Sequence, residues 1–200
     1  MLYLNQLDYP DMPYLHDTSN PNGPRHDNVA KSGCGLCSAC MMVDRLTAKK
    51  LPLEEAIRLS EENGCNTLPG TRMRYLGPIL AEKYNLTFAK SKSMEDVIAC
   101  LMKGGCVIIN VGGDHDDHKG VFSKEGHYIT AISWDGEELY ILDPSWKEDK
   151  FKQPHALGKV REDYPFLYCK PEVIEADTAN RETPFYLFER KMPAAEEKTE

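Results

Sequence analysis

Three cysteines at intervals of three residues, Cys34, Cys37 and Cys40 in KSGCGLCSACMMVD, are the first residues whose types and spacing could do chemistry. Cysteine thiolates bind zinc and iron–sulfur clusters, and a single thiolate is a strong nucleophile. The run lacks the fourth cysteine and the proline of the ferredoxin-type motif, and structural zinc prefers paired cysteines from separate segments. We therefore expect one reactive thiol rather than a set of metal ligands.

Cys34 is the candidate nucleophile because it lies between Gly33 and Gly35, where a turn-rich segment gives way to a helical pattern. At a helix N-terminus the helix dipole and the unpaired N–H groups favour the thiolate. The small neighbours would let a substrate carbonyl approach the backbone N–H of Cys34, as an oxyanion donor requires. The alternative is a small buried residue in a tight turn.

A base for this thiol is found in GHYITAISWDGEELYILDPS, where His127 begins one predicted strand and Asp143 ends the next. The intervening Asp135-Gly136 pair is typical of a hairpin turn. In an antiparallel hairpin the start of the first strand lies beside the end of the second, so His127 and Asp143 should be neighbours. Asp143 would then accept one imidazole N–H and fix the tautomer that faces the sulfur. Taken separately, each residue would more often be structural.

Four short motifs together resemble the papain-like cysteine peptidases of the bacteriocin-processing, double-glycine-leader type. They are LNQLDYP, GCG opening a helix, GHY followed by β-branched residues, and a strand ending in DP, and they span roughly residues 3 to 145. The resemblance implies that Cys34 is the nucleophile, His127 the general base and acid, and Asp143 the orienting carboxylate. It also implies that Gln6 is the side-chain donor of the oxyanion hole. Without the resemblance, Gln6 would be an exposed turn residue.

The sequence departs from the family pattern directly after GCG. The family usually has proline and threonine there, whereas this chain has Leu36 and Cys37. Loss of the proline relaxes the first helical turn, and Cys37 could form a disulfide or compete for oxidants near the active centre. Neither change removes a catalytic group, although both leave the substrate class more open.

The function that the resemblance implies is hydrolysis of peptide bonds or small amides through a thioester intermediate, with no cofactor. Two alternatives remain open at this point. The same triad could transfer an acyl group to an amine, as in transglutaminase-like relatives, or the fold could be a non-catalytic peptide-binding module.

A second cluster of polar residues, GGDHDDHKG at 112–120, precedes the His127 strand. Adjacent carboxylates in a glycine-flanked loop need no ligand, so a solvated loop is the default interpretation. The alternative is a divalent ion held by His115, His118 and one aspartate. We also consider the hypothesis that this loop borders the substrate cleft and selects basic or amine-bearing substrates.

The composition indicates a single soluble globular domain, because 200 residues with 41% hydrophobic and 28% charged side chains can bury a sizeable core. The net charge of -8 argues against nucleic acid and favours a cationic or neutral partner. We find no apolar run that could span a membrane and no signal peptide, so a cytoplasmic location is expected; a secreted form with a trimmed leader is the alternative. Seven scattered cysteines favour reduced thiols, with Cys65, Cys100, Cys106 and Cys169 as core residues.

The elements that must position these residues form an α+β, papain-like pattern of N-terminal helices packed on a C-terminal antiparallel sheet. Apolar periodicity predicts a helix from residue 35, a second over LPLEEAIRLSEENG, a third over TRMRYLGPILAEKYN that is interrupted at Gly77-Pro78, and a fourth over SMEDVIACLMKGG. Strands are predicted at CVIINVGG, at the two halves of the hairpin and at PFYLFER. We assign no element to 147–183, expect one domain over 1–190, and expect a disordered tail over 191–200.

Overall fold

A computed structural model of the 200-residue chain describes residues 1–14, 27–67 and 70–191. The predicted tail at 191–200 lies almost wholly outside the described residues. The helices and single 3-10 turns are η1 (Gln6–Asp8), α1 (Val29–Ser32), α2 (Cys34–Leu46), α3 (Leu53–Glu62), α4 (Met73–Tyr84), α5 (Met94–Met102), η2 (Lys150–Lys152) and α6 (Pro171–Thr178). The strands are β1 (Asn66–Thr67), β2 (Gly70–Thr71), β3 (Leu86–Ser91), β4 (Cys106–Val111), β5 (His127–Trp134), β6 (Leu139–Leu142), β7 (Val160–Asp163), β8 (Phe166–Cys169) and β9 (Phe185–Arg190).

Seven of these strands form one sheet in the order β3-β9-β4-β5-β6-β8-β7, and every neighbouring pair is antiparallel. The predicted strands at β4, β5, β6 and β9 are confirmed. The last strand, β9, lies between β3 and β4, so the C-terminal part of the chain joins β3, at the edge of the sheet, to the central strands.

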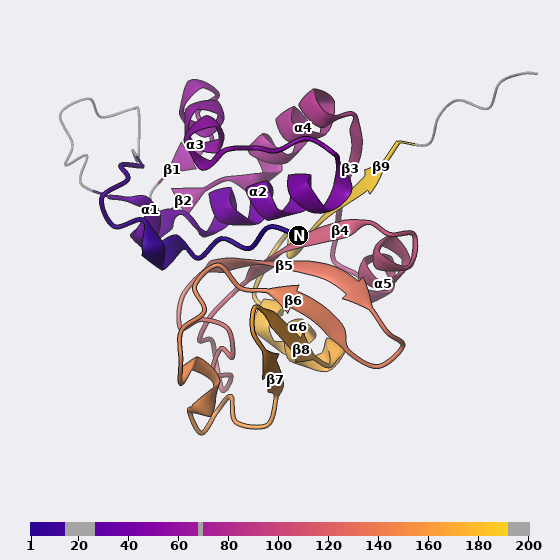
Figure 1. Ribbon diagram of the computed structural model, residues 1–200. Coiled ribbons are helices and arrows are strands. Elements are labelled where there is room, and N and C mark those ends of the chain that lie inside the picture. Colours follow the sequence, from indigo (N-terminus) through magenta and orange to yellow (C-terminus); the bar gives the residue numbers. More distant parts are fainter. Residues whose placement is uncertain (15–26, 68–69, 192–200) are drawn as a thin grey trace, which may run out of the picture.

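Helices cover both faces of this sheet (Figure 1). The side chains of β4 alternate, as expected for a strand that is buried on both sides. Cys106 and Ile108 join the core that contains α2, α3 and α4, whereas Val107 and Ile109 join the core that contains α5 and α6. The observed α+β architecture therefore matches the predicted one, with a second helical layer that sequence patterns did not assign.

The helix α4 continues through Gly77-Pro78, where an interruption was predicted. Proline costs the helix one hydrogen bond, but the helix buries Leu76 and Leu80 on one face. A Cβ atom at Gly77 would collide with the ring of Phe88, so this glycine lets β3 pack closely against α4. Tertiary packing thus outweighs the local helix-breaking tendency.

The segment over residues 147–183 also differs from the sequence-based description. It contains η2, the β7–β8 hairpin and α6, which extend the sheet and cover its second face. Within the described part of the chain, no helix is long and apolar enough to cross a bilayer.

Candidate active site

Cys34 is the first residue of α2, and Gly33 is the N-cap. The Cys34 side chain is only partly buried, and it lines an open cavity. The other six cysteines are buried and free, so the described residues contain no disulfide. Cys34 is therefore the one thiol of the seven that combines a helix N-terminus with access to a cavity.

The hairpin β5–β6 brings His127 and Asp143 together as the sequence predicts. Thr130 pairs with Leu142, which fixes the register that places Asp143 beside the start of β5. Nε2 of His127 lies 2.8 Å from Oδ1 of Asp143, and both residues are buried. Because Asp143 engages Nε2, Nδ1 is the ring nitrogen left for the hydrogen bond to Cys34.

Cys34, His127 and Asp143 shift one another's pKa values. Burial disfavours the thiolate of Cys34, but the hydrogen bond and positive charge of His127 outweigh burial and lower the pKa of Cys34 below its usual value. Burial also disfavours the imidazolium, yet the charge of Asp143, its hydrogen bond and the contact with Cys34 raise the pKa of His127 to about 9. Together these shifts favour a thiolate–imidazolium pair near neutral pH.

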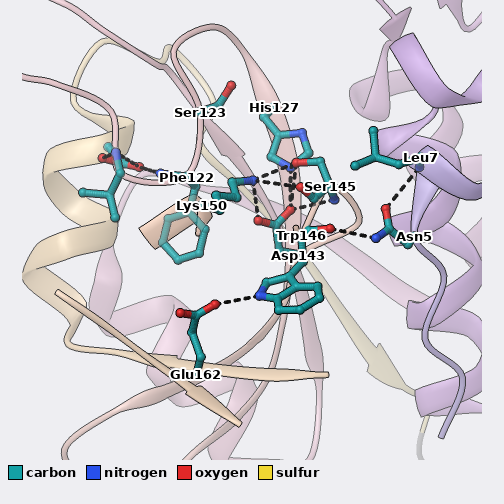
Figure 2. A network of polar contacts seen from close by, with 12 residues as sticks. Asn5, Leu7, Phe122, Ser123, His127, Asp143, Ser145, Trp146, Lys150 and Glu162 are labelled. Atoms are coloured by element: carbon teal, nitrogen blue, oxygen red, sulfur yellow. Dashed lines mark hydrogen bonds and ion pairs between the residues drawn. The ribbon is translucent and has the colours of Figure 1, made fainter. Parts of the chain in front are cut away.

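Lys150 and Ser145 complete the surroundings of Asp143, and sequence reasoning missed both. Nζ of Lys150 lies 2.6 Å from Oδ2 of Asp143 and 2.7 Å from Oγ of Ser145, which in turn lies 3.0 Å from Nε2 of His127 (Figure 2). Burial raises the pKa of Asp143, but the charges of Lys150 and His127 hold it well below its usual range. Lys150 itself is only 12% exposed, so this is a largely buried, four-membered polar network.

The N-terminal segment ties this network to the helical side of the molecule. Tyr3 Oη donates to the backbone carbonyl of Asp143 at 2.8 Å, and the Gln6 N–H donates to the carbonyl of Pro144 at 2.6 Å. Asn5 Nδ2 donates to the carbonyl of Trp146 at 2.7 Å (Figure 2). Three hydrogen bonds within four residues therefore hold the loop that carries the carboxylate.

Gln6 is buried rather than exposed, and its side chain is held beside α1. Its Nε2 donates to the carbonyl of Ala30 at 2.7 Å, whereas its buried Oε1 has no hydrogen-bond partner among the described residues. An amide nitrogen carries two hydrogens, and Ala30 accepts one of them. The structure places Gln6 near the turn that precedes Cys34, but Gln6 does not line the cavity.

Gly35 has a packing role that the sequence analysis did not predict, in addition to the access to the Cys34 N–H that was expected. A Cβ atom at this position would lie 2.8 Å from Cβ of Thr71 and 3.2 Å from the ring of Tyr128, which is too close for ordinary contacts. Gly35 is therefore required for packing of α2 against β2 and β5. Cys37 and Cys40 are fully buried and free, and burial raises the pKa of each thiol.

The cavity beside Cys34 and His127 has a volume of about 430 Å³. Its charged side chains come from the segment around the start of α4 and from the segment that precedes β9: Arg72, Arg74, Arg181 and Glu182. No residue of the 112–120 loop lines it. Asp114, Lys119 and Gly120 of the loop line a second cavity instead, together with Ser145 and Lys150. The hypothesis that the loop selects basic substrates therefore stays a prediction.

The loop is anchored by protein contacts. His118 Nε2 lies 2.7 Å from Oδ1 of the buried Asp177, and His115 Nε2 lies 3.2 Å from the carbonyl of Ala176. In the described ranges, no group of three or more His, Cys, Asp or Glu side chains is arranged to hold a metal ion. The divalent-ion alternative for this loop thus lacks a ligand set, while Asp116 and Asp117 are exposed, as a solvated loop requires.

Comparison with known proteins supports the fold. No protein-family model and no curated protein sequence matches the chain. The structure is similar to a solved structure described as a "putative C39-like peptidase from Bacillus anthracis", with a TM-score of 0.51 and 14% sequence identity over 92% of this chain and 97% of that one. At this identity the likeness concerns the fold alone, and the fold is the expected papain-like cysteine peptidase fold.

Proposed function

We propose that this protein is a cysteine peptidase or amide hydrolase in which Cys34, His127 and Asp143 form the catalytic triad. The observation that carries the proposal is the position of His127, which hydrogen-bonds the Cys34 thiol with one ring nitrogen and the buried Asp143 carboxylate with the other. This arrangement lies at a helix N-terminus on the wall of an open cavity. It matches the geometric requirement for an activated thiol nucleophile with an oriented base.

In the proposed reaction the Cys34 thiolate attacks the carbonyl carbon of an amide, and the oxyanion that forms accepts hydrogen bonds from the Cys34 backbone N–H and from Gln6 Nε2. The imidazolium of His127 then protonates the leaving amine as the C–N bond breaks, which leaves a thioester on Cys34. Neutral His127 next removes a proton from water as the water oxygen attacks the carbonyl carbon of the thioester. The C–S bond then breaks, which releases the carboxylic acid and restores the Cys34 thiolate beside the His127 imidazolium. Asp143 fixes the tautomer of His127 and stabilises its charged form throughout.

Gln6 takes part in this scheme through its second amide hydrogen, because Ala30 accepts only the first. Its burial and its fixed contact with α1 would keep the donor in place without reorganisation. The narrower assignment, to the bacteriocin-processing peptidases with double-glycine leaders, is a proposal that rests on the four sequence motifs.

The test is site-specific labelling followed by peptide cleavage. A limiting dose of iodoacetamide applied to the native protein should modify Cys34 well before the six buried thiols, as mapped by mass spectrometry. A mixed peptide library should be cleaved by the native protein and by Cys37→Ala, the control for loss of a neighbouring thiol, but not by Cys34→Ala. Uniform labelling, or cleavage that survives Cys34→Ala in a folded protein, would refute the proposed function.

A further inference from the structure

The cavity beside Cys34 has the opposite charge from the chain as a whole. The chain carries a net charge of -8, yet the described residues that line this cavity include three arginines, Arg72, Arg74 and Arg181, and one acidic residue, Glu182. The thiolate and imidazolium at its base cancel each other in net charge. A ligand that enters this cleft therefore meets an excess of positive charge.

The arginines come from two separate segments of the chain. Arg72 and Arg74 flank the start of α4, directly after the β2 strand whose Thr71 packs on Gly35. Arg181 belongs to the turn between α6 and β9. Both segments therefore contribute guanidinium groups to the lining of the cavity that contains Cys34.

Arg181 is held firmly against the residue that precedes the base. Its Nε and Nη2 donate to the carbonyl of Val111 at 3.2 and 2.9 Å, and Val111 pairs with His127 across β4 and β5. A Cβ atom at Gly126 would collide with Nη2 of Arg181, so the guanidinium lies directly over this glycine. The Arg181 guanidinium is thus held beside Gly126, the residue that precedes His127.

Tyr186 lies close enough to Arg74 and Arg181 for both charges to affect its pKa. Burial raises the pKa of Tyr186, while a hydrogen bond with Tyr128 and the positive charges of Arg74 and Arg181 act in the opposite direction. Tyr186 lines the same cavity. Arg74 and Arg181 therefore converge on one region of the cleft rather than pointing into separate solvent.

None of these arginines is neutralised by the protein. Among the residues that the structure describes, Arg72, Arg74 and Arg181 have no carboxylate partner, although ion pairs occupy several other basic side chains, including Arg58 and Lys83. Guanidinium groups recognise carboxylates through paired N–H donors. Unpaired guanidinium groups at a nucleophile are therefore suited to an anionic ligand.

We propose that the cleft selects anionic substrates, namely peptides or small amides that carry a carboxylate close to the scissile amide, which Arg72, Arg74 and Arg181 bind. This inference rests on the proposed function, because it concerns the same nucleophile. Two exposed ion pairs, such as those of Arg72 and Arg74 with one carboxylate ligand, should together change the preference by about fivefold. The preference should weaken as ionic strength rises.

The first experiment compares alkylation of Cys34 by anionic iodoacetate and by neutral iodoacetamide, with free glutathione as the reference thiol. In the native protein the ratio of the iodoacetate rate to the iodoacetamide rate should exceed the glutathione ratio by about fivefold. The Arg72→Gln, Arg74→Gln double variant, which retains Arg181, should lose most of this excess, and a double variant to lysine should keep it. Arg58→Gln with Lys83→Gln removes two charges outside the cleft and should leave the ratio unchanged.

A second measurement uses peptides that differ only in glutamate, glutamine or lysine next to the cleaved bond, and it compares kcat/KM values for the same variants. Glutamate should be preferred about fivefold in the native protein and in the lysine double variant, but not in the glutamine double variant. This inference alone would be overturned if the ratio of the iodoacetate rate to the iodoacetamide rate in the native protein equalled that of glutathione. It would also be overturned if the glutamine double variant kept the preference for glutamate as the lysine double variant does. Failure of Cys34 to react ahead of the other thiols would overturn the proposed function, and this inference with it.

Discussion

Lys150 is expected to set the ionisation of His127 from the far side of Asp143. Both the Lys150 ammonium and the His127 ring contact Ser145 Oγ, at 2.7 and 3.0 Å, so the two nitrogens are at most about 6 Å apart. The positive charge of Lys150 opposes a second positive charge on the imidazole. Replacing Lys150 with methionine should therefore stabilise the imidazolium and raise the pKa of His127 above its value of about 9.

The size of the effect follows from Coulomb's law. Two unit charges about 6 Å apart, at an effective dielectric constant of about 20, interact by about 2.8 kcal/mol, which corresponds to about two pKa units. Water that enters the space left by the ammonium will screen part of this interaction. We therefore expect the pKa of His127 to rise by about one unit in Lys150→Met.

The measurement is an NMR titration of the imidazole Cε1–Hε1 signals. The chain has six histidines, and the His127 signal is identified by its absence in a His127→Asn variant. Lys150→Arg keeps the charge and should leave the pKa of His127 nearly unchanged. Lys147→Met removes an exposed lysine that does not contact Asp143 and serves as the matched control.

A constant or lower pKa of His127 in Lys150→Met would refute this reasoning. A lower value would mean that Asp143 turns away from the imidazole once Lys150 is removed. Lys150 would then act by holding the carboxylate in place rather than through its charge.

Three further predictions concern the same site and its supports. Alkylation of Cys34 by iodoacetate should be fast at neutral pH, because the thiolate persists below the usual thiol pKa. The rate should decline with a midpoint near pH 9, because His127 then loses its proton and its charge. A single rise near the usual thiol pKa would contradict the thiolate–imidazolium pair. Gly35→Ala should force Thr71 away from α2, slow Cys34 alkylation and lower the free energy of unfolding by about 1–3 kcal/mol while circular dichroism stays native. An unchanged alkylation rate and an unchanged stability would contradict the packing role. Asp177→Asn should lower the free energy of unfolding by about 3 kcal/mol in urea titrations. The reason is that a buried carboxylate that hydrogen-bonds His118, Val121 and Phe122 becomes an amide. A loss below about 1 kcal/mol would contradict this reasoning.

The approach of His127 to Asp143 could be predicted because it depends on local geometry. The Asp135-Gly136 turn joins two short strands, and antiparallel pairing then leaves little freedom in which residues meet at the open end. The position of Cys34 at the start of α2 was predictable for the same reason, since glycines flank it where the helical pattern begins. Each of these features is contained within about twenty residues of sequence.

The remaining parts of the site depend on loop conformation and on strand order. Lys150 lies only seven residues after Asp143, and it follows Asp149, whose left-handed backbone conformation at the start of η2 has no signal in the apolar pattern. Arg181 reaches the cleft because β9 inserts beside β4, and strand order is not encoded in the local alternation of apolar residues. Sequence patterns therefore identified the three residues of the proposed triad but not the neighbouring groups that shift their pKa values.

The net charge of the chain and the charge of the cleft differ in sign. A charge of -8 predicted a cationic or neutral partner, whereas the cleft presents guanidinium groups from Arg72, Arg74 and Arg181 to an incoming ligand. At physiological ionic strength, charges more than about 8 Å away are largely screened, so a bound substrate responds mainly to the side chains that line the cleft. We therefore expect the excess of acidic residues elsewhere, including the exposed Asp116 and Asp117, to affect solubility and long-range encounter, and the three arginines to determine which substrate is held in front of Cys34.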